Sequence, residues 1–256
     1  MNLILPKRFG QDKPPVSSQI NRGHPLAQGL VGCWLFNEGA GRRVHDLSGR
    51  GNHGTLIDIA TPPTPDSGWN PGRVGIGLKF DGVNDYIDCG DNLEWPGALS
   101  VSSWYKRNYK DTVNADGIIG NWYFIANSQL RRGWLLRYYI NTDLLVFIIE
   151  LTNGSSIQER QISYTTNVGE WYHAVAVFNP SDRSIKLYVN GILRSSTTVS
   201  ADYNQIVHDS PYPMRIGYNP VNGGYFPGLI DEVCIYNRAL SASEVSWLFC
   251  EPYAMF

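Results

Sequence analysis

Residues 171–191, WYHAVAVFNPSDRSIKLYVNG, decide the fold class. Two runs rich in β-branched and aromatic residues flank the stretch NPSDRS, whose residues favour a tight turn. The pattern predicts an antiparallel hairpin. In its second run, alternate residues from Ile185 to Val189 share a face that we expect to pack, and Lys186 and Tyr188 share a face that we expect to meet water.

The same pattern extends outward along the chain. Asn190-Gly191 favours a type I′ turn into a further strand, and Asn153-Gly154 joins the runs LLVFIIELT and SSIQERQISY in the same way. A single short helix is predicted near the C-terminus, where Ser241 and Glu244 have the spacing of a capping box. We therefore predict an all-β fold, a two-sheet antiparallel β-sandwich with one short C-terminal helix.

The chain divides into two parts of different character. Residues 1–29 are polar, rich in proline and without period, which predicts an extended N-terminal arm or docking segment. Residues 30–256 show short apolar runs separated by turn residues, and this length is within the range of one large β-sandwich. We predict one sandwich domain over 30–256.

Charge and composition restrict the partners and the compartment. A net charge of -2 offers no general attraction to nucleic acid, and no apolar run reaches the roughly 18 residues of a membrane span, so neither nucleic-acid binding nor membrane insertion is expected. No signal peptide is visible, and the localisation stays open. The cysteines are widely spaced in apolar surroundings, which favours reduced core thiols over a zinc site; they are Cys33, Cys89, Cys234 and Cys250.

Several segments, in order, carry a resemblance to a known family. They include GLVGCWLFNEGAG, VGIGLKFDGVNDYIDCG, GEWYHAVAVFNPSDRSIKLYVNGIL and MRIGYNPVNGGYFPGLIDEVCIYNRALSASEV. From about Gly29 to Phe249 the chain resembles the laminin-G-like, concanavalin-A-like jelly-roll family. The resemblance implies two curved antiparallel sheets, often one calcium ion, and a role in recognising sugars, proteins or surfaces.

Asp231 raises the question of a metal. Strand alternation in GLIDEVCIY puts it on the face of Val233 and Ile235, which look like core positions, and a buried carboxylate needs a partner. The loop DLSGRGNHG supplies Asp46 and Asn52 as oxygen ligands, and calcium-binding family members resemble this arrangement. We predict a calcium site at Asp46, Asn52 and Asp231. The alternative is that Asp46 caps a turn and Asp231 accepts hydrogen bonds from backbone amides.

Catalysis is not expected. Glucan-cleaving relatives present an E-x-D-x-x-E run on one strand, and no such run exists here. Asp231 and Glu232 are adjacent, so simple alternation points them to opposite faces. Sugar binding instead needs aromatic side chains beside hydrogen-bonding groups, and Trp122, Tyr218 and Tyr225 in loop-like segments are the predicted ligand-binding residues. The alternative for each of these rings is packing in the core.

Two functions follow from these observations. The first is a non-catalytic binding module that recognises a glycan or a protein surface. The second is a structural or decoration protein of a larger assembly, such as a homo-oligomer or a phage particle, docked through the arm. The opening MNLILPKRFG is similar to the starts of bacteriophage particle proteins that bear laminin-G-like domains, which would place the protein in a virion.

Overall fold

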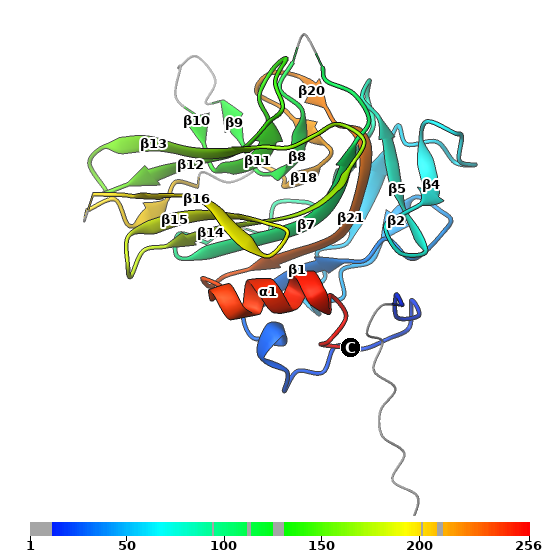
Figure 1. The fold of residues 1–256 in the computed structure, drawn as a ribbon, viewed down its shortest axis with the longest axis horizontal. Coiled ribbons are helices and arrows are strands. Elements are labelled where there is room, and N and C mark those ends of the chain that lie inside the picture. The colour runs from blue at the N-terminus through cyan, green and yellow to red at the C-terminus, as the bar shows by residue number, and fades with distance from the viewer. Residues whose placement is uncertain (1–11, 94, 112–113, 125–130, 201, 209–211) are drawn as a thin grey trace, which may run out of the picture.

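The predicted hairpin lies within one of two large antiparallel sheets that face each other (Figure 1). The computed structural model describes residues 12–93, 95–111, 114–124, 131–200, 202–208 and 212–256. One sheet, called here the helix-side sheet, runs in the order β16-β15-β14-β7-β21-β5-β4, with β1 beside β21; the other, the far sheet, runs β13-β12-β11-β8-β18-β6-β3-β2, with β17 beside β12. The predicted two-sheet β-sandwich is confirmed.

The strands of the helix-side sheet are β1 (Leu30–Trp34), β4 (Gly68–Pro71), β5 (Ile76–Asp81), β7 (Leu99–Arg107), β14 (Trp171–Asn179), β15 (Ser184–Val189), β16 (Ile192–Thr198) and β21 (Pro227–Tyr236). Those of the far sheet are β2 (Arg43–Val44), β3 (Gly54–Ile57), β6 (Tyr86–Asp88), β8 (Gly117–Gly120), β11 (Trp134–Tyr138), β12 (Leu144–Thr152), β13 (Ile157–Thr165), β17 (Gln205–Ile206) and β18 (Arg215–Ile216). Two small pairs complete the strands, β9 (Tyr123–Phe124) with β10 (Arg131–Arg132), and β19 (Tyr218–Asn219) with β20 (Gly224–Tyr225). The helices are the 3-10 turn η1 (Pro25–Ala27) and α1 (Ala242–Cys250).

Local turn chemistry explains the hairpins. Asn190 and Gly191 both have positive φ, 52° and 74°, which a type I′ turn requires. The pair β12 and β13 forms the second predicted hairpin around Asn153-Gly154. Helix α1 begins with the predicted capping box, in which the Ser241 side chain accepts from the Glu244 backbone N–H and Glu244 accepts from the Ser241 N–H.

The structure has a main core between the sheets and a second core outside them. Ile185 and Leu187 are fully buried in the main core, as predicted. Tyr188, expected to meet water, is only 5% exposed. The expectation was wrong because α1 covers this outer face of the helix-side sheet, and Val245 and Leu248 of the helix pack in one cluster with Tyr188 (Figure 1).

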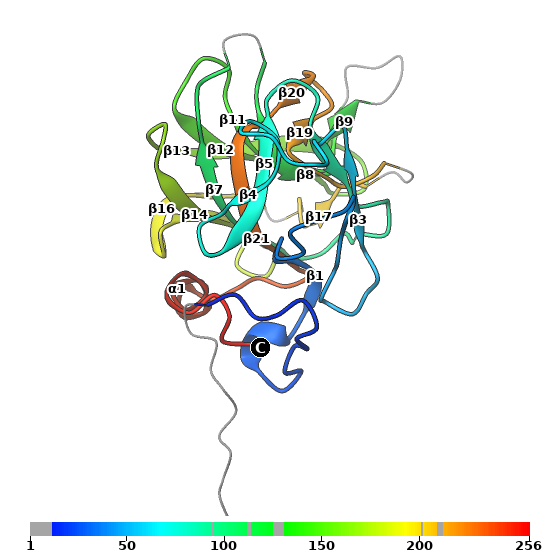
Figure 2. The ribbon, with the colours of Figure 1, turned by 90° about the vertical axis from the view of Figure 1, so that its right-hand side faces the viewer.

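The segment before β1 lies against this second core. The first eleven residues of the predicted arm lie outside the described residues, whereas Ile20 and Leu26 are buried in the cluster beneath α1. The Asn21 N–H donates to the Met255 carbonyl at 2.7 Å, so the segment and the C-terminal residues lie side by side (Figures 1 and 2).

A β-bulge in β21 changes which way Asp231 faces. The register with β7 shifts between Asp231 and Cys234, and Glu232 has a φ of 50°. Val233 therefore packs in the main core, while Asp231 pairs with Trp104, whose ring stacks on Phe249 of α1. The expectation that Asp231 shares a face with Val233 was wrong, because it assumed uninterrupted alternation.

Two further features bear on the sequence-based expectations. Three of the cysteines are buried free thiols, with the Cys33 and Cys234 sulfurs 3.6 Å apart across β1 and β21, whereas Cys250 at the end of α1 is exposed. Within the described residues, none of the helices has the length and apolar character that crossing a membrane requires.

Candidate functional site

The outer face of the far sheet carries side chains of four neighbouring strands in one row. Leu135 of β11 lies opposite Gly120 of β8, Gly120 opposite Arg215 of β18, and Arg215 opposite Asp88 of β6. Leu135 belongs to a small apolar cluster with Trp122, Val146 and Ile148, separate from the main core. Gly120 has no side chain, and a Cβ there would lie only 2.8 Å from Leu135 Cδ1, so the Leu135 side chain packs directly over this glycine.

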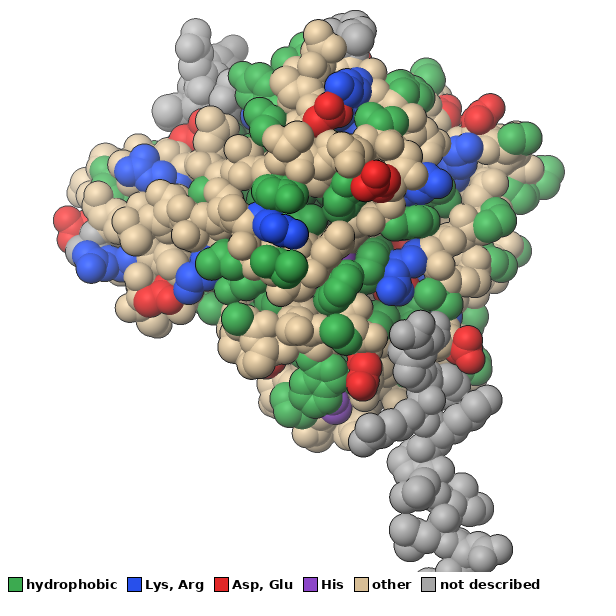
Figure 3. Space-filling view, viewed as in Figure 1, with side chains coloured by type: hydrophobic (Ala, Val, Ile, Leu, Met, Phe, Trp, Pro, Cys, Tyr) green, Lys and Arg blue, Asp and Glu red, His purple; other side chains and the backbone are tan. Residues whose placement is uncertain are grey.

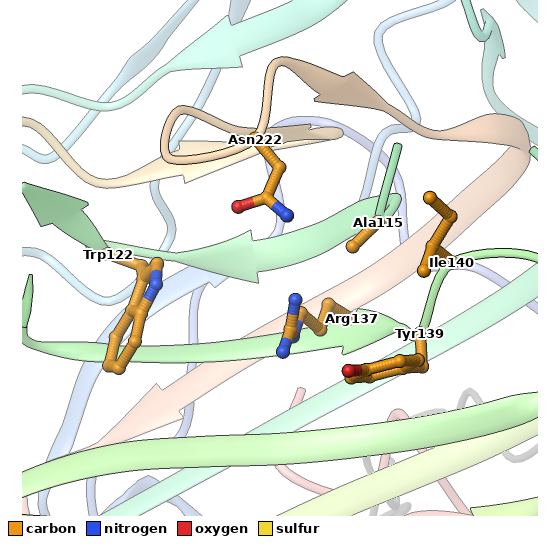
Figure 4. Close-up of a pocket in the computed structure, with 6 residues that line it drawn as sticks. All are labelled: Ala115, Trp122, Arg137, Tyr139, Ile140 and Asn222. Carbon is orange, nitrogen blue, oxygen red and sulfur yellow. The ribbon is translucent and has the colours of Figure 1, made fainter. Parts of the chain in front are cut away.

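Trp122 and Arg137 line a cavity of about 130 Å³ on this face (Figure 4). In Figure 4 the Arg137 guanidinium lies between the Trp122 indole and the Tyr139 ring, and Asn222 faces it from the turn between β19 and β20. Arg137 is 8% exposed and its guanidinium carbon lies 5.3 Å from the Tyr139 ring centroid. Ala115 and Ile140 complete the wall. The cavity thus combines aromatic surface with an amide and a guanidinium.

A second cavity, of about 270 Å³, lies beyond Trp122. Its walls include Tyr123 and Tyr212, whose rings stack with centroids 3.6 Å apart. Arg215, Pro213 and Pro220 line it as well. Trp122 is therefore the wall that the two cavities share.

A tyrosine cluster continues the same face. Tyr218 and Tyr225 stack at 4.5 Å between ring centroids, and Tyr86 of β6 lies 5.3 Å from Tyr218. The Arg215 guanidinium carbon lies 5.4 Å from both the Tyr86 and the Tyr218 ring centroids. Burial, and next the neighbouring Tyr218, raise the pKa of Tyr225.

The three aromatic residues predicted to bind ligand thus come to one face. Trp122 is buried at 2% exposure, and Tyr218 and Tyr225 are half-buried. Arg215 connects them, because it lines a cavity with Trp122 and covers Tyr218. Figure 3, in the orientation of Figure 1, shows hydrophobic side chains mixed with scattered charges of both signs, rather than one basic patch.

Sequence reasoning missed several polar and aromatic residues of this face, namely Tyr86, Arg137, Tyr139, Arg215 and Asn222. Alternation around the core residue Ile87 would have pointed Tyr86 outward, and alternation around Leu136 and Tyr138 would have done so for Arg137. No local signal relates Asn222 to Arg137, because a hairpin 85 positions later in the chain brings them together.

The predicted metal ligands fall into two separate hydrogen-bonded groups. Oδ1 of Asp46 accepts from the Cys33 and Ser48 N–H groups at 2.9 and 2.8 Å. Its Oδ2 accepts from the Ser48 hydroxyl at 2.7 Å and the Asn52 N–H at 3.0 Å, while the Asn52 amide donates to Val31. These four donors use the roughly four lone-pair sites of a carboxylate. A cation would have to displace them.

Asp231 is bonded to different groups. Lys13 Nζ lies 2.5 Å from Asp231 Oδ1, and the Arg73 and Glu232 N–H groups donate to its carboxylate at 3.1 and 3.0 Å. Burial raises the pKa of Asp231, and the Lys13 ammonium opposes that rise. Because the Lys13 ammonium already pairs with Asp231, the groups around this carboxylate do not fit calcium in this arrangement. Calcium at Asp46, Asn52 and Asp231 stays a prediction.

The bulge also overturns the parity argument about Asp231 and Glu232. Both carboxylates approach Arg73, since Glu232 Oε1 lies 3.8 Å from its Nη1. Asp231 is fully buried and Glu232 is 4% exposed, and Tyr253 donates a hydrogen bond to Glu232. The pair is therefore enclosed by the chain's own side chains rather than presented at the surface. In the part of the chain that the structure describes, no three His, Cys, Asp or Glu residues cluster as a metal site would require.

The fold and this aromatic outer face define a lectin-like β-sandwich of the jelly-roll kind. The family model described as the concanavalin A-like lectin/glucanases superfamily matches residues 81–246, well over half of the chain. The chain belongs to this superfamily. A comparison with curated proteins gave no match.

Solved structures of the same fold include two binding domains of toxins and one domain of an arabinanase. The receptor binding domain of botulinum neurotoxin D is 16% identical with a TM-score of 0.60, covering 88% of this chain and 53% of that one. The binding domain of Paraclostridial Mosquitocidal Protein 1 is 18% identical with a TM-score of 0.62, covering 88% and 52%. The chain thus spans about half the length of these toxin domains.

A third structure is of similar length. Domain 4 of AbnA, an extracellular arabinanase from Geobacillus stearothermophilus, was solved in complex with arabinotriose. It is 19% identical with a TM-score of 0.54, and the alignment covers 86% of this chain and 97% of that domain. At these identities the likeness concerns the fold.

Proposed function

We propose that the chain is a non-catalytic glycan-binding module and that the sugar binds on the outer face of the far sheet. One observation carries the proposal: Trp122, Arg137, Tyr139 and Asn222 converge on a single cavity from three segments of the chain. Aromatic rings bury the apolar face of a sugar, while amide and guanidinium groups donate to its hydroxyls.

The relatives support this reading. One toxin structure is a receptor binding domain, and the arabinanase domain of matching length was solved with arabinotriose. The buried state of Asp231 and Glu232 supports the non-catalytic part of the proposal, because a substrate cannot reach carboxylates enclosed by Lys13 and Tyr253.

The first prediction tests the cavity. The full chain, applied to a glycan array, should bind a defined set of glycans. Tyr139→Ala should then weaken the best of them about tenfold by calorimetry, equivalent to about 1.4 kcal/mol, because the exposed ring supplies contact surface for the sugar. The bound glycan should be recovered uncleaved.

The matched control is Leu193→Ala. Leu193 is 46% exposed and Tyr139 is 44% exposed, but Leu193 lies on β16 of the helix-side sheet. This variant should bind like the wild type. Equal weakening by both substitutions, or an array without any binding, would remove the support for this site.

A further inference from the structure

The two cavities that share Trp122 indicate how long the sugar ligand is, an inference that rests on the proposed function. Their volumes are about 130 and 270 Å³. A pocket that encloses one drug-sized ligand measures about 300–1,000 Å³. Neither cavity reaches that size, so each suits a small unit rather than a complete large ligand.

Each cavity has its own set of binding groups. The smaller one has Arg137, Asn222 and the exposed ring of Tyr139. The larger one has Arg215 and the stacked rings of Tyr123 and Tyr212. Repetition of the same chemistry, an aromatic wall beside a guanidinium, on both sides of one indole is what a ligand of repeating units requires.

Trp122 is a fixed divider between the two cavities. Its side chain is 2% exposed and packs with Leu135, Val146 and Ile148 in the apolar cluster of the outer face. Moving the indole would expose this cluster to water, which is unfavourable. A ligand that uses both cavities therefore has to cross over the indole.

We infer that the outer face of the far sheet binds an oligosaccharide of at least two units, with one sugar in each cavity and the glycosidic linkage over Trp122. The ligand thus lies across two neighbouring shallow cavities instead of entering one deep pocket. A free monosaccharide would occupy one cavity only and bind more weakly.

The second prediction tests this inference with a series of ligands of increasing length, applied to the full protein. The probes are the mono-, di- and trisaccharides of three sugars: arabinose to arabinotriose, glucose to cellotriose, and galactose to galactotriose. In the series that binds, calorimetry should show at least tenfold tighter binding of the trisaccharide than of the monosaccharide. Equal affinity of the two would overturn the inference while leaving the proposed function intact.

Substitutions test whether the larger cavity provides the tighter binding of the trisaccharide. Tyr212→Ala should remove most of the trisaccharide advantage, because it lowers the affinity for the trisaccharide more than the affinity for the monosaccharide, whereas Tyr212→Phe, which keeps the ring, should retain the advantage. Tyr139→Ala should weaken both probes. Thermal melts of the variants show whether the fold is kept. A Tyr212→Phe protein that folds but lacks the chain-length gain contradicts the inference, and failure of every probe and of the glycan array contradicts the proposed function with it.

Discussion

His173 shows how a single buried ring depends on its surroundings. It is 1% exposed, it stacks on Trp104 at 5.0 Å between centroids, and its Nε2 is hydrogen-bonded to the Ser102 hydroxyl at 2.8 Å. Burial, and then the nearby Arg73 charge, lower the pKa of His173 to about 3. In the unfolded chain the histidine has its ordinary pKa of about 6.5. Between pH 3 and pH 6.5 the imidazole is therefore mostly protonated in the unfolded chain and mostly neutral in the folded chain.

The third prediction follows from the sign of this shift. Because the folded pKa is depressed, the neutral ring stabilises the fold above pH 6.5, and this contribution falls as the pH drops from 6.5 toward 3. Relative to His173→Phe, the wild type should lose about 2 kcal/mol of unfolding free energy between pH 7.5 and pH 5. Urea denaturation at both values measures it.

Phenylalanine keeps the stack on Trp104 and removes the titrating group. Leu193→Ala, at an exposed position without a titrating group, should retain the wild-type pH dependence. A constant difference in unfolding free energy between wild type and His173→Phe at the two pH values would mean that His173 is protonated in the fold, against its enclosed position.

Alternation along a strand predicted the face of a side chain correctly where the strand is regular and wrongly where a bulge interrupts it. Ile185 and Leu187 were placed correctly because β15 is regular. Asp231 was misplaced because the bulge at Glu232 breaks the period of two, and nothing in the letters DEVC marks a positive φ at a glutamate. The neighbours of Asp231 were invisible as well, since Lys13 is 218 positions away.

Helix α1 is the element whose ends the sequence specified most fully. Ser241 and Glu244 exchange the two hydrogen bonds of the capping box, and Arg238 holds the Glu244 carboxylate at 2.6 Å. Burial alone would raise the pKa of Glu244, but the hydrogen bonds from Arg238 and from the Ser241 backbone N–H together lower this pKa below its ordinary value. The helix in turn covers Tyr188 on the helix-side sheet.

The fourth prediction concerns this cap. Ser241→Ala removes the acceptor for the Glu244 N–H and should destabilise the protein by about 1 kcal/mol. For a chain of this size the melting temperature should fall by about 2–4 °C in calorimetry. Ser246→Ala, an exposed position of α1 beyond the cap, should leave it unchanged or slightly higher, since alanine favours helix. A lower melt for Ser246→Ala alone would contradict the cap argument.

Elements differ in how far sequence can reach them. The two hairpins were predictable because the turn residues and both strands are adjacent in the chain. The candidate site was predictable only in part: Trp122, Tyr218 and Tyr225 lie on the outer face, but the grouping of Arg137 with Asn222 depends on sheet register between distant strands. The order of strands in a sandwich is a long-range property that local patterns do not encode.

At the scale of the whole molecule, residues 12–29 are joined to the fold. Leu26 is fully buried with Val245 and Leu248 of α1, and Arg238 donates to the Gln28 and Pro25 carbonyls at 2.7 and 3.0 Å. The assembly role predicted for the arm stays a prediction.

The fifth prediction tests this attachment. Leu26→Ala should cost about 2–5 kcal/mol of unfolding free energy, because it leaves a cavity in the second core. Val16→Ala, 43% exposed in the same segment, should change stability by less than about 0.5 kcal/mol. Chemical denaturation measures both. If Leu26→Ala left the unfolding free energy unchanged, the segment would fold and unfold independently of the sandwich.

The hydrogen bond from Asn21 to the Met255 carbonyl has a practical consequence for handling the molecule. The described chain enters and leaves at the end where α1 lies, and β9, β10 and β20 lie at the opposite end in Figure 1. A reporter protein, a biotin tag or a solid support attached to the C-terminus would therefore sit away from the face on which we propose that sugar binds. Through this terminus the protein can be displayed in a uniform orientation on a sensor chip.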